Sequence, residues 1–381
     1  EAENNSLDLN PFIEYRKLLW SYHLATSQGM SDQNFLDIVK NLDDAVSELT
    51  GTGFRETPLV FLSELSKAIG QDGGVWAKNE TINVSGSHKA RHLFGLALRL
   101  EIEEVSKNKP LTIASCGNAA LAASVIAKAA KRNLTVNVPT WADTSLLDGL
   151  SDYGARIQIC ERRNGESGDP CMLRFKELLE EGALPFGCQG TENIWTIDGG
   201  KTLGFEMSTQ LNRYDLEPDR LLVQVGGGAL ASSTMQARTD AKNFGILKNR
   251  PSLNTVQASG CSPLLIAFNQ ISDSDNPSEA LSEAISNPLK YMKPWENPSS
   301  AATGIEPALV LSNKIISSVN QFCLVLGLCF SLRTTKSRKA RSMPRWDTGQ
   351  WAAEILHTSR VCVSVDGEII SGEGGNAGCI L

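Results

Sequence analysis

Lys89 is the residue of this chain whose surroundings most favour covalent chemistry. It lies in the segment 84–91, VSGSHKAR, where Ser87 is placed as the N-cap of a helix predicted over residues 88–104. A lysine amine that is poorly solvated and close to a helix N-terminus is easily kept neutral. A neutral amine can attack an aldehyde and form a Schiff base. The alternative interpretation is an ordinary surface lysine that follows a capped helix start.

A second segment has the composition of a carboxylate-binding loop. Residues 115–120, SCGNAA, stand between a predicted strand at 111–114 and a predicted helix at 118–131. Ligands of α/β proteins bind at such places, outside the carboxyl end of a strand and at a helix N-terminus. The Ser115 hydroxyl and exposed N–H groups can hold a carboxylate there, and the Asn118 amide can contact a ring hydroxyl. A plain strand–helix turn is the alternative.

Three consecutive glycines form a third candidate, suited to an anion. Gly226, Gly227 and Gly228, which we call the glycine loop, follow a predicted strand at 221–225 and precede a predicted helix at 230–240. Consecutive glycines let the backbone approach an anion closely, and the helix dipole favours negative charge. No Gly-Lys-Ser/Thr follows, and the GxGxxG spacing of dinucleotide-binding folds is absent. A phosphate monoester is therefore the favoured ligand, and a flexible glycine turn is the alternative.

The three segments together suit one cofactor, pyridoxal 5′-phosphate, which needs an amine for its aldehyde, donors for its phosphate and a contact for its ring hydroxyl. With them the chain resembles the fold type II pyridoxal-phosphate enzymes. That family includes threonine synthase, threonine and serine dehydratases, cysteine synthase, the tryptophan synthase β subunit and diaminopropionate ammonia-lyase. The resemblance covers about residues 50–305. Its motifs are TPL at 57–59, SGSHKAR at 85–91, SCGN at 115–118, DGGKT at 198–202, Glu206 and the glycine loop.

The resemblance implies roles for the residues of the first two segments. Lys89 would be the catalytic residue and would carry the cofactor as a Schiff base. Asn118 would contact the ring oxygen of the cofactor. Ser115, Gly117 and Asn118 would line the loop that binds the substrate carboxylate.

The resemblance also assigns the phosphate and the pyridine nitrogen. The phosphate would lie on Gly226, Gly227, Gly228 and Ala229, where Ala229 replaces the fourth glycine that is usual in the dehydratases. Ser371, in the segment SGEGGN at 371–376, would lie near the pyridine nitrogen. A glycine-rich C-terminal loop is the alternative for that segment.

Hydrophobic periodicity predicts the elements that position these segments. Residues 11–50 have helical spacing, and strands alternate with helices from 111 to 258, which indicates an α/β protein with a mostly parallel sheet. The predicted strands are 75–78, 111–114, 134–138, 155–159, 221–225 and 254–258. The predicted helices beyond residue 104 are 118–131, 146–153, 172–181, 202–211 and 230–240.

The resemblance implies two domains, each a mostly parallel twisted sheet flanked by helices. We expect an N-terminal helical arm at 1–50, a large cofactor-phosphate-binding domain at 51–86 and 206–381, and a smaller substrate-loop domain at 87–205. The alternation stops over 306–346, where a basic run extends from Arg333 to Arg345. This predicts an irregular C-terminal region, which is either an exposed insert or a damaged sequence. A basic tail that binds nucleic acid or membrane is the third, less favoured interpretation.

The composition limits the partners of the chain. Its 381 residues are 41% hydrophobic and carry a net charge of −7, which is typical of a globular protein and argues against nucleic acid as a partner. The apolar stretch 322–332 is too short to span a bilayer, so no membrane partner is expected. The chain begins EAENN, without methionine or a signal peptide, which indicates a fragment or a processed form.

Cysteines and histidines indicate the compartment and the metal content. Nine cysteines without a CxxC pair indicate a reducing compartment, and we expect a cytoplasmic protein. His88 and His92 are four residues apart, but such a pair more often packs than chelates, so no metal is predicted. The family resemblance implies a homodimer.

The predicted function is that of a pyridoxal-phosphate-dependent lyase. It would catalyse β-elimination, and so deamination, of a small amino acid such as threonine, serine or diaminopropionate. Two alternatives stay open. One is a synthase of the threonine-synthase or cysteine-synthase kind that replaces a substituent, and the other is a catalytically impaired protein that binds the cofactor.

Overall fold

A computed structural model gives the fold. It describes residues 10–71, 73–189, 192–249, 251–257 and 260–292, and the backbone of two short strands at 362–363 and 378–380. The expected irregular region at 306–346 and the candidate residue Ser371 lie outside the described residues.

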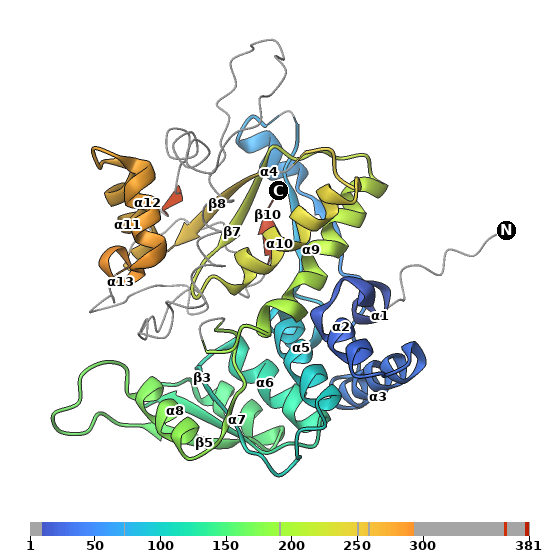
Figure 1. The fold of residues 1–381 in the computed structure, drawn as a ribbon, viewed down its shortest axis with the longest axis vertical. Helices are drawn as coiled ribbons and strands as arrows, with labels where there is room; N and C mark the ends of the chain where they lie inside the picture. Colours follow the sequence, from blue (N-terminus) through green and yellow to red (C-terminus); the bar gives the residue numbers. More distant parts are fainter. Residues whose placement is uncertain are drawn as a thin grey trace.

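A four-stranded parallel sheet forms the lower part of the molecule in Figure 1. Its order is β5-β4-β3-β6. Its strands are β3 (Leu111–Ala114), β4 (Leu134–Pro139), β5 (Arg156–Cys160) and β6 (Leu184–Pro185), and its helices are α6 (Asn118–Ala129), α7 (Thr144–Asp152) and α8 (Pro170–Glu180). Successive residues of a strand point to opposite faces of the sheet. Ile113 therefore packs into the core shared with α6, while Ala114 packs against α8 on the other face. The predicted alternation of strands and helices is confirmed here.

A six-stranded sheet forms the upper part, in the order β1-β2-β10-β7-β8-β9. The strands are β1 (Leu59–Phe61), β2 (Trp76–Asn79), β7 (Arg220–Gln224), β8 (Ser252–Gln257), β9 (Cys362–Val363) and β10 (Gly378–Ile380). Strands β7, β8 and β9 are parallel. The strands β7 and β8 correspond to the predicted strands 221–225 and 254–258, and β9 was not predicted. The other half is antiparallel, since β1 pairs with β2, and β10 pairs with both β2 and β7. In that half only β2 was predicted, as the strand 75–78. The strands β1 and β10 and the antiparallel pairing were not, because β1 and β10 have only three residues each, too few for a periodic pattern.

Three helices meet between the two sheets, α5 (Lys89–Ile102), α9 (Thr196–Arg213) and α10 (Ala229–Asn243). Helix α9 packs against both of the others. Its glycines make this close approach possible: a Cβ atom at Gly199 would lie 2.1 Å from the Arg91 carbonyl oxygen, and one at Gly204 would lie 2.6 Å from the Cβ of Ala237. Any larger residue would force the helices apart.

The predicted helical arm is observed as α1 (Pro11–Glu14), the short helix η2 (Arg16–Leu18), α2 (Trp20–Ser27) and α3 (Asp32–Thr50). Its Phe12 ring lies 4.5 Å from Phe94 of α5 and 5.3 Å from Phe54, measured between ring centroids. Helix α2 has no capping side chain of its own. The carboxylate of Asp198, in α9, accepts hydrogen bonds from the N–H groups of Trp20 and Ser21 instead, at 2.8 and 2.9 Å.

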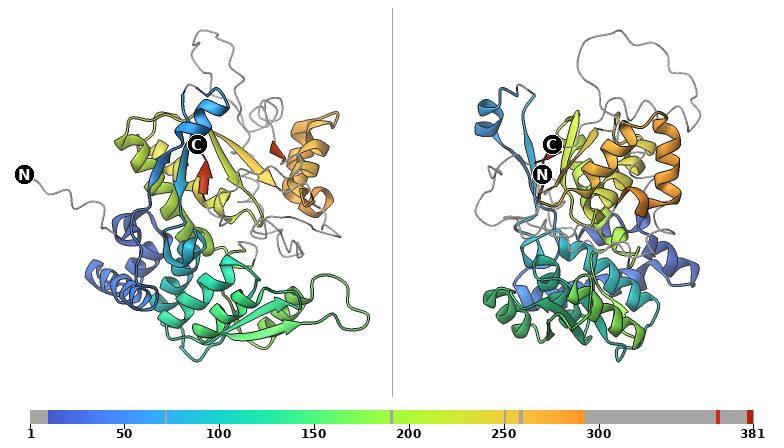
Figure 2. Two further views of the ribbon diagram at one scale, coloured as in Figure 1. Left: turned by 180° about the vertical axis from the view of Figure 1, so that it is seen from behind. Right: turned by 90° about the vertical axis from the view of Figure 1, so that its left-hand side faces the viewer.

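The remaining helices are α4 (Ser63–Ala68), α11 (Pro263–Ser272), α12 (Pro277–Ser286) and α13 (Pro288–Tyr291), and the last three each begin with proline. Helices α11–α13 share a small core of their own and lie on the side of the molecule away from α1–α3, as Figure 1 and the left view of Figure 2 show. In the described part of the chain, no helix has the length and apolar character needed to cross a membrane. The expected domain boundaries stay a prediction.

Candidate active site

Lys89 begins helix α5, and its N–H group donates a hydrogen bond of 3.3 Å to the Ser87 hydroxyl. Ser87 thus helps to cap the helix, as the sequence predicted, although His88 is the N-cap residue. The side chain of Lys89 is half-buried. Its amine forms no hydrogen bond or ion pair with any residue in the described ranges, so it is available for a ligand.

Two buried histidines lie beside this lysine. Their rings make an edge-to-face contact with centroids 5.8 Å apart. Burial, followed by the charge of Lys89, lowers the pKa of His88 far below its ordinary value and lowers the pKa of His92 to about 3. Both imidazoles are therefore neutral near pH 7. The Nδ1 atom of His92 lies 2.8 Å from the Thr196 carbonyl oxygen, which fixes that ring on α9.

Helix α9 brings the N-terminus of α5 close to that of α10. A Cβ atom at Gly200 would lie 2.2 Å from Cε1 of His92 and 2.6 Å from Oγ of Ser233. His92 is about one turn beyond Lys89, and Ser233 is about one turn beyond Ala229, the first residue of α10. The side chains of His92 and Ser233 both lie beside Gly200. The N-termini of α5 and α10, where Lys89 and the glycine loop lie, are therefore neighbours.

The glycine loop joins β7 to α10, as predicted. Gly228, the N-cap residue of α10, has φ 81°, a conformation that favours glycine. A Cβ atom at Gly227 would meet only the Cγ atom of Gln189, at 3.9 Å, within 4 Å. Cys188, the residue before Gln189, places its Sγ atom 3.8 Å from the Lys89 carbonyl oxygen. The segment 188–189 therefore lies beside both the glycine loop and the start of α5. This is a second indication, besides the contacts at Gly200, that the two are close together.

The third predicted segment follows β3 at the carboxyl edge of the parallel sheet. Ser115 continues the strand pairing, with its N–H group 3.2 Å from the Asn137 carbonyl oxygen. Gly117 is the N-cap residue of α6, and Asn118 is its first residue. A Cβ atom at Gly117 would meet no atom within 4 Å, so the space beside the loop is open. The short helix η3 (Val84–Gly86), just before Lys89, packs against α6.

Several residues of this site were not given a role from the sequence. His88 stood inside the lysine motif without one, and Cys188 and Gln189 follow a two-residue strand, β6, that no pattern indicated. Burial raises the pKa of the Cys188 thiol to about 11, so it is uncharged. Lys78 and Glu80 belong to a buried ion-pair network with Arg91 and Glu206, whose partners are far apart in sequence. Ser371 lies outside the described residues, so its predicted place near the pyridine nitrogen stays a prediction.

The family model described as "Pyridoxal-phosphate dependent enzyme" matches residues 51–308. The chain belongs to this family. The match includes Lys89, the 115–118 loop and the glycine loop, and it begins after the helical arm. The predicted family and the predicted cofactor, pyridoxal 5′-phosphate, are therefore confirmed.

Curated relatives with related names are similar over part of their length. The threonine synthase of Synechocystis sp. is 26% identical over 240 residues, which are 63% of this chain and 59% of that protein. The biosynthetic L-threonine dehydratase IlvA of Staphylococcus epidermidis is 27% identical over 194 residues, which are 51% of this chain and 44% of that protein. The chain thus spans less than two thirds of either relative.

Solved structures show the same fold. Maize serine racemase has a TM-score of 0.51 at 20% identity, covering 73% of each chain. The threonine deaminase of T.th. also has a TM-score of 0.51 at 20% identity, covering 74% of this chain and 78% of its own. The predicted α/β fold of the type II enzymes is therefore confirmed.

The residues at the starts of α5 and α10 fit the cofactor. A phosphate needs N–H donors, and the glycine loop at the N-terminus of the 15-residue helix α10 offers them together with the helix dipole. Within the described ranges, both ring nitrogens of His88 and the Oγ atom of Ser85 are buried and have no hydrogen-bond partner. Buried polar groups are rarely left unpaired, so these atoms indicate a polar ligand beside Lys89.

Proposed function

We propose that this chain is a pyridoxal-phosphate-dependent lyase that deaminates a small amino acid, such as threonine, serine or diaminopropionate, by β-elimination. One observation carries the proposal: an amine without a protein partner in the described ranges begins α5, and a glycine loop begins α10, with His92 and Ser233 meeting over Gly200. This arrangement suits a ligand that has an aldehyde and a phosphate. The threonine dehydratases among the relatives support the lyase, while the threonine synthases among them support the synthase alternative.

In this proposal the binding residues act through backbone donors and one amine. The N–H groups of the glycine loop and Ala229 bind the phosphate. Lys89 would hold the cofactor by its aldehyde. Ser115, Gly117 and Asn118 bind the substrate carboxylate, and the Asn118 amide also contacts the ring oxygen. The neutral His88 ring provides a hydrogen bond without placing a second positive charge beside the amine.

The reaction then needs a base at the substrate's α-carbon. When bound, the cofactor supplies an electron sink for the bonds at that carbon. The amine of Lys89 would remove the α-proton as general base and hold it at Nζ. Loss of the β-substituent together with a proton, followed by addition of water, would release ammonia and a keto acid.

The test of the lysine assignment is the Lys89→Ala variant. Purified wild-type protein with the cofactor should be yellow, and borohydride should fix the cofactor on the Lys89 peptide. The variant should lose the yellow colour, the fixed label and turnover. Lys40→Ala, at an exposed position of α3, is the matched control and should keep all three. A Lys89→Ala protein that keeps both colour and turnover would show that the assignment is wrong.

The reaction class is tested with a panel of amino acids, measuring ammonia and keto acid with and without sulfide. A lyase releases both products without sulfide. A synthase of the cysteine-synthase kind forms its product only when sulfide is present. One of the threonine-synthase kind, which the threonine synthase relative favours, adds water and releases phosphate from a phosphorylated hydroxy amino acid, so phosphate is measured as well. Yellow protein that forms none of these products would indicate the impaired cofactor-binding protein. The expected homodimer and cytoplasmic location stay predictions, and analytical ultracentrifugation would test the first.

A further inference from the structure

The turn that precedes Lys89 has an unfavourable backbone conformation. Ser85 has φ 51° and Gly86 has φ 68°, so two consecutive residues are left-handed. A residue with a Cβ atom loses about 1 kcal/mol or more in this region. The Ser85 hydroxyl is buried and forms no hydrogen bond to a described residue that would offset this. Interactions outside the turn must therefore hold it.

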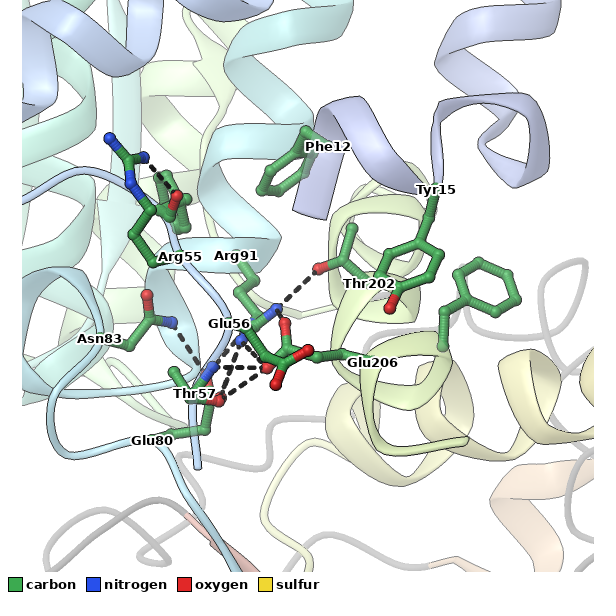
Figure 3. A network of polar contacts seen from close by, with 12 residues as sticks. Phe12, Tyr15, Arg55, Glu56, Thr57, Glu80, Asn83, Arg91, Thr202 and Glu206 are labelled. Atoms are coloured by element: carbon green, nitrogen blue, oxygen red, sulfur yellow. Dashed lines mark hydrogen bonds and ion pairs between the residues drawn. The ribbon is translucent and has the colours of Figure 1, made fainter. Parts of the chain in front are cut away.

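Three side chains, which we call the clamp, tie the two ends of this turn together: Glu80, Asn83 and Arg91. The Arg91 guanidinium donates from Nε and Nη2 to the two carboxylate oxygens of Glu80, at 2.8 and 2.9 Å. The Asn83 amide donates to Glu80 at 2.8 Å and, at 3.4 Å, to the Ser87 carbonyl oxygen. The segment from 80 to 91 is thus closed by hydrogen bonds before and after the turn, as Figure 3 shows for these residues.

The clamp is fixed to α9 and to the start of the large sheet. Arg91 also donates to Glu206 at 2.9 and 3.1 Å and to the Thr57 hydroxyl at 3.2 Å. Lys78 also pairs with Glu206, at the Oε1 atom that accepts from Nη2 of Arg91. The side chains of these three ion pairs are at most 1% exposed. Two cations and two anions are therefore enclosed without net charge, and the guanidinium has no freedom to move away.

We infer that Arg91, through the clamp, is a positioning residue for Lys89. Arg91 and Lys89 are two residues apart on α5, so their side chains leave the helix about 200° apart and Arg91 does not reach the reacting atoms. Its effect is exerted through the turn 83–87, which the clamp holds so that the Lys89 amine points toward the glycine loop. The inference rests on the proposed role of Lys89.

The test uses Arg91→Lys, which keeps the charge but cannot donate in a bidentate manner to both carboxylates. In the protein without cofactor, hydrogen–deuterium exchange in the peptide 83–89 should become about tenfold faster. With cofactor, the rate at which borohydride-trapped label appears on Lys89 should fall about tenfold, and kcat should fall while KM changes little.

The matched control is Arg213→Lys, the same substitution in a bidentate pair outside the clamp, where Arg213 donates to the two carboxylate oxygens of Glu56 at 2.9 and 3.1 Å. It should leave exchange at 83–89 and the labelling rate unchanged. Asn83→Ala, which keeps all four charges, should reproduce the Arg91→Lys result and takes its place if that variant does not fold. Exchange and labelling equal to wild type in the folded clamp variants would overturn the inference.

The two proposals fail in different ways. If wild-type protein takes no label on Lys89, the proposed function is wrong, and the exchange rates still decide whether the clamp holds the turn. If wild type is labelled normally and the clamp variants match it, the positioning role alone is wrong.

Discussion

At the scale of single residues, the buried carboxylate of Glu206 forms ion pairs with two buried cations, Arg91 and Lys78. Burial opposes its ionisation, but the charges of Arg91 and Lys78 outweigh burial and lower its pKa to about 2. Glu206 also accepts the Thr57 N–H group at 2.7 Å. One side chain therefore joins α9 to α5, to β2 and to the segment before β1.

Replacing Glu206 by Gln should destabilise the protein by about 3–5 kcal/mol, because two buried cations would lose their common partner. Urea unfolding followed by far-UV circular dichroism measures the change. Glu283→Gln is the control, since Glu283 pairs with Lys290 at the surface, where both side chains are partly exposed. Equal unfolding midpoints for the two variants would contradict this account of the network.

At the scale of elements, the glycines of α9 set how closely α5 and α10 approach each other. Gly200→Ala would place its methyl group against His92 and Ser233, so we expect a loss of about 1–3 kcal/mol and weaker cofactor binding. Gly117→Ala is the contrasting variant, because a Cβ atom there meets no atom within 4 Å. It should leave stability unchanged while obstructing the proposed carboxylate site. Thermal melts and cofactor titrations of both variants separate the two effects, and equal melting temperatures would refute the packing argument.

The same glycines show where sequence reasoning succeeds and where it fails. The predicted helices that follow β3 and β7 are observed within a few residues, because their apolar spacing and flanking glycines are local signals. Helix α9 was predicted from 202 but begins at Thr196. Gly199 and Gly200 are weak helix formers, and only the contacts with Arg91, Gly95 and His92 make them favourable there. Contacts between distant segments, as between Lys78 and Glu206, leave no local pattern either.

At the scale of the whole molecule, the arm outside the family match is part of the same core. Lys201 donates to the Leu18 carbonyl oxygen at 2.9 Å and lies 4.8 Å from the Trp20 ring centroid. Tyr15 donates its hydroxyl proton to Thr209, also in α9, at 3.2 Å. The arm therefore stabilises the helix that places α5 and α10, so its folding and that of the site should be cooperative.

Three buried groups, His88, His92 and Glu206, should each make the folded protein less stable as the pH falls. The pKa of His92, about 3, and that of His88 lie below the ordinary value of 6.5, so the unfolded chain binds more protons than the folded one as pH falls. Their stabilising contribution is complete above pH 6.5 and is lost as pH decreases toward 3. Glu206 adds a loss in the same direction as pH falls from 4.5 toward 2.

The free energy of unfolding should therefore be nearly constant with respect to these groups above pH 6.5 and should decrease below it. His92→Asn keeps a donor for the Thr196 carbonyl oxygen and removes one titrating group, so the slope between pH 6 and 4 should shrink by about 1.4 kcal/mol per pH unit. Urea titrations at several pH values measure the slope. An unchanged slope in His92→Asn would mean that His92 is not held neutral by burial beside Lys89.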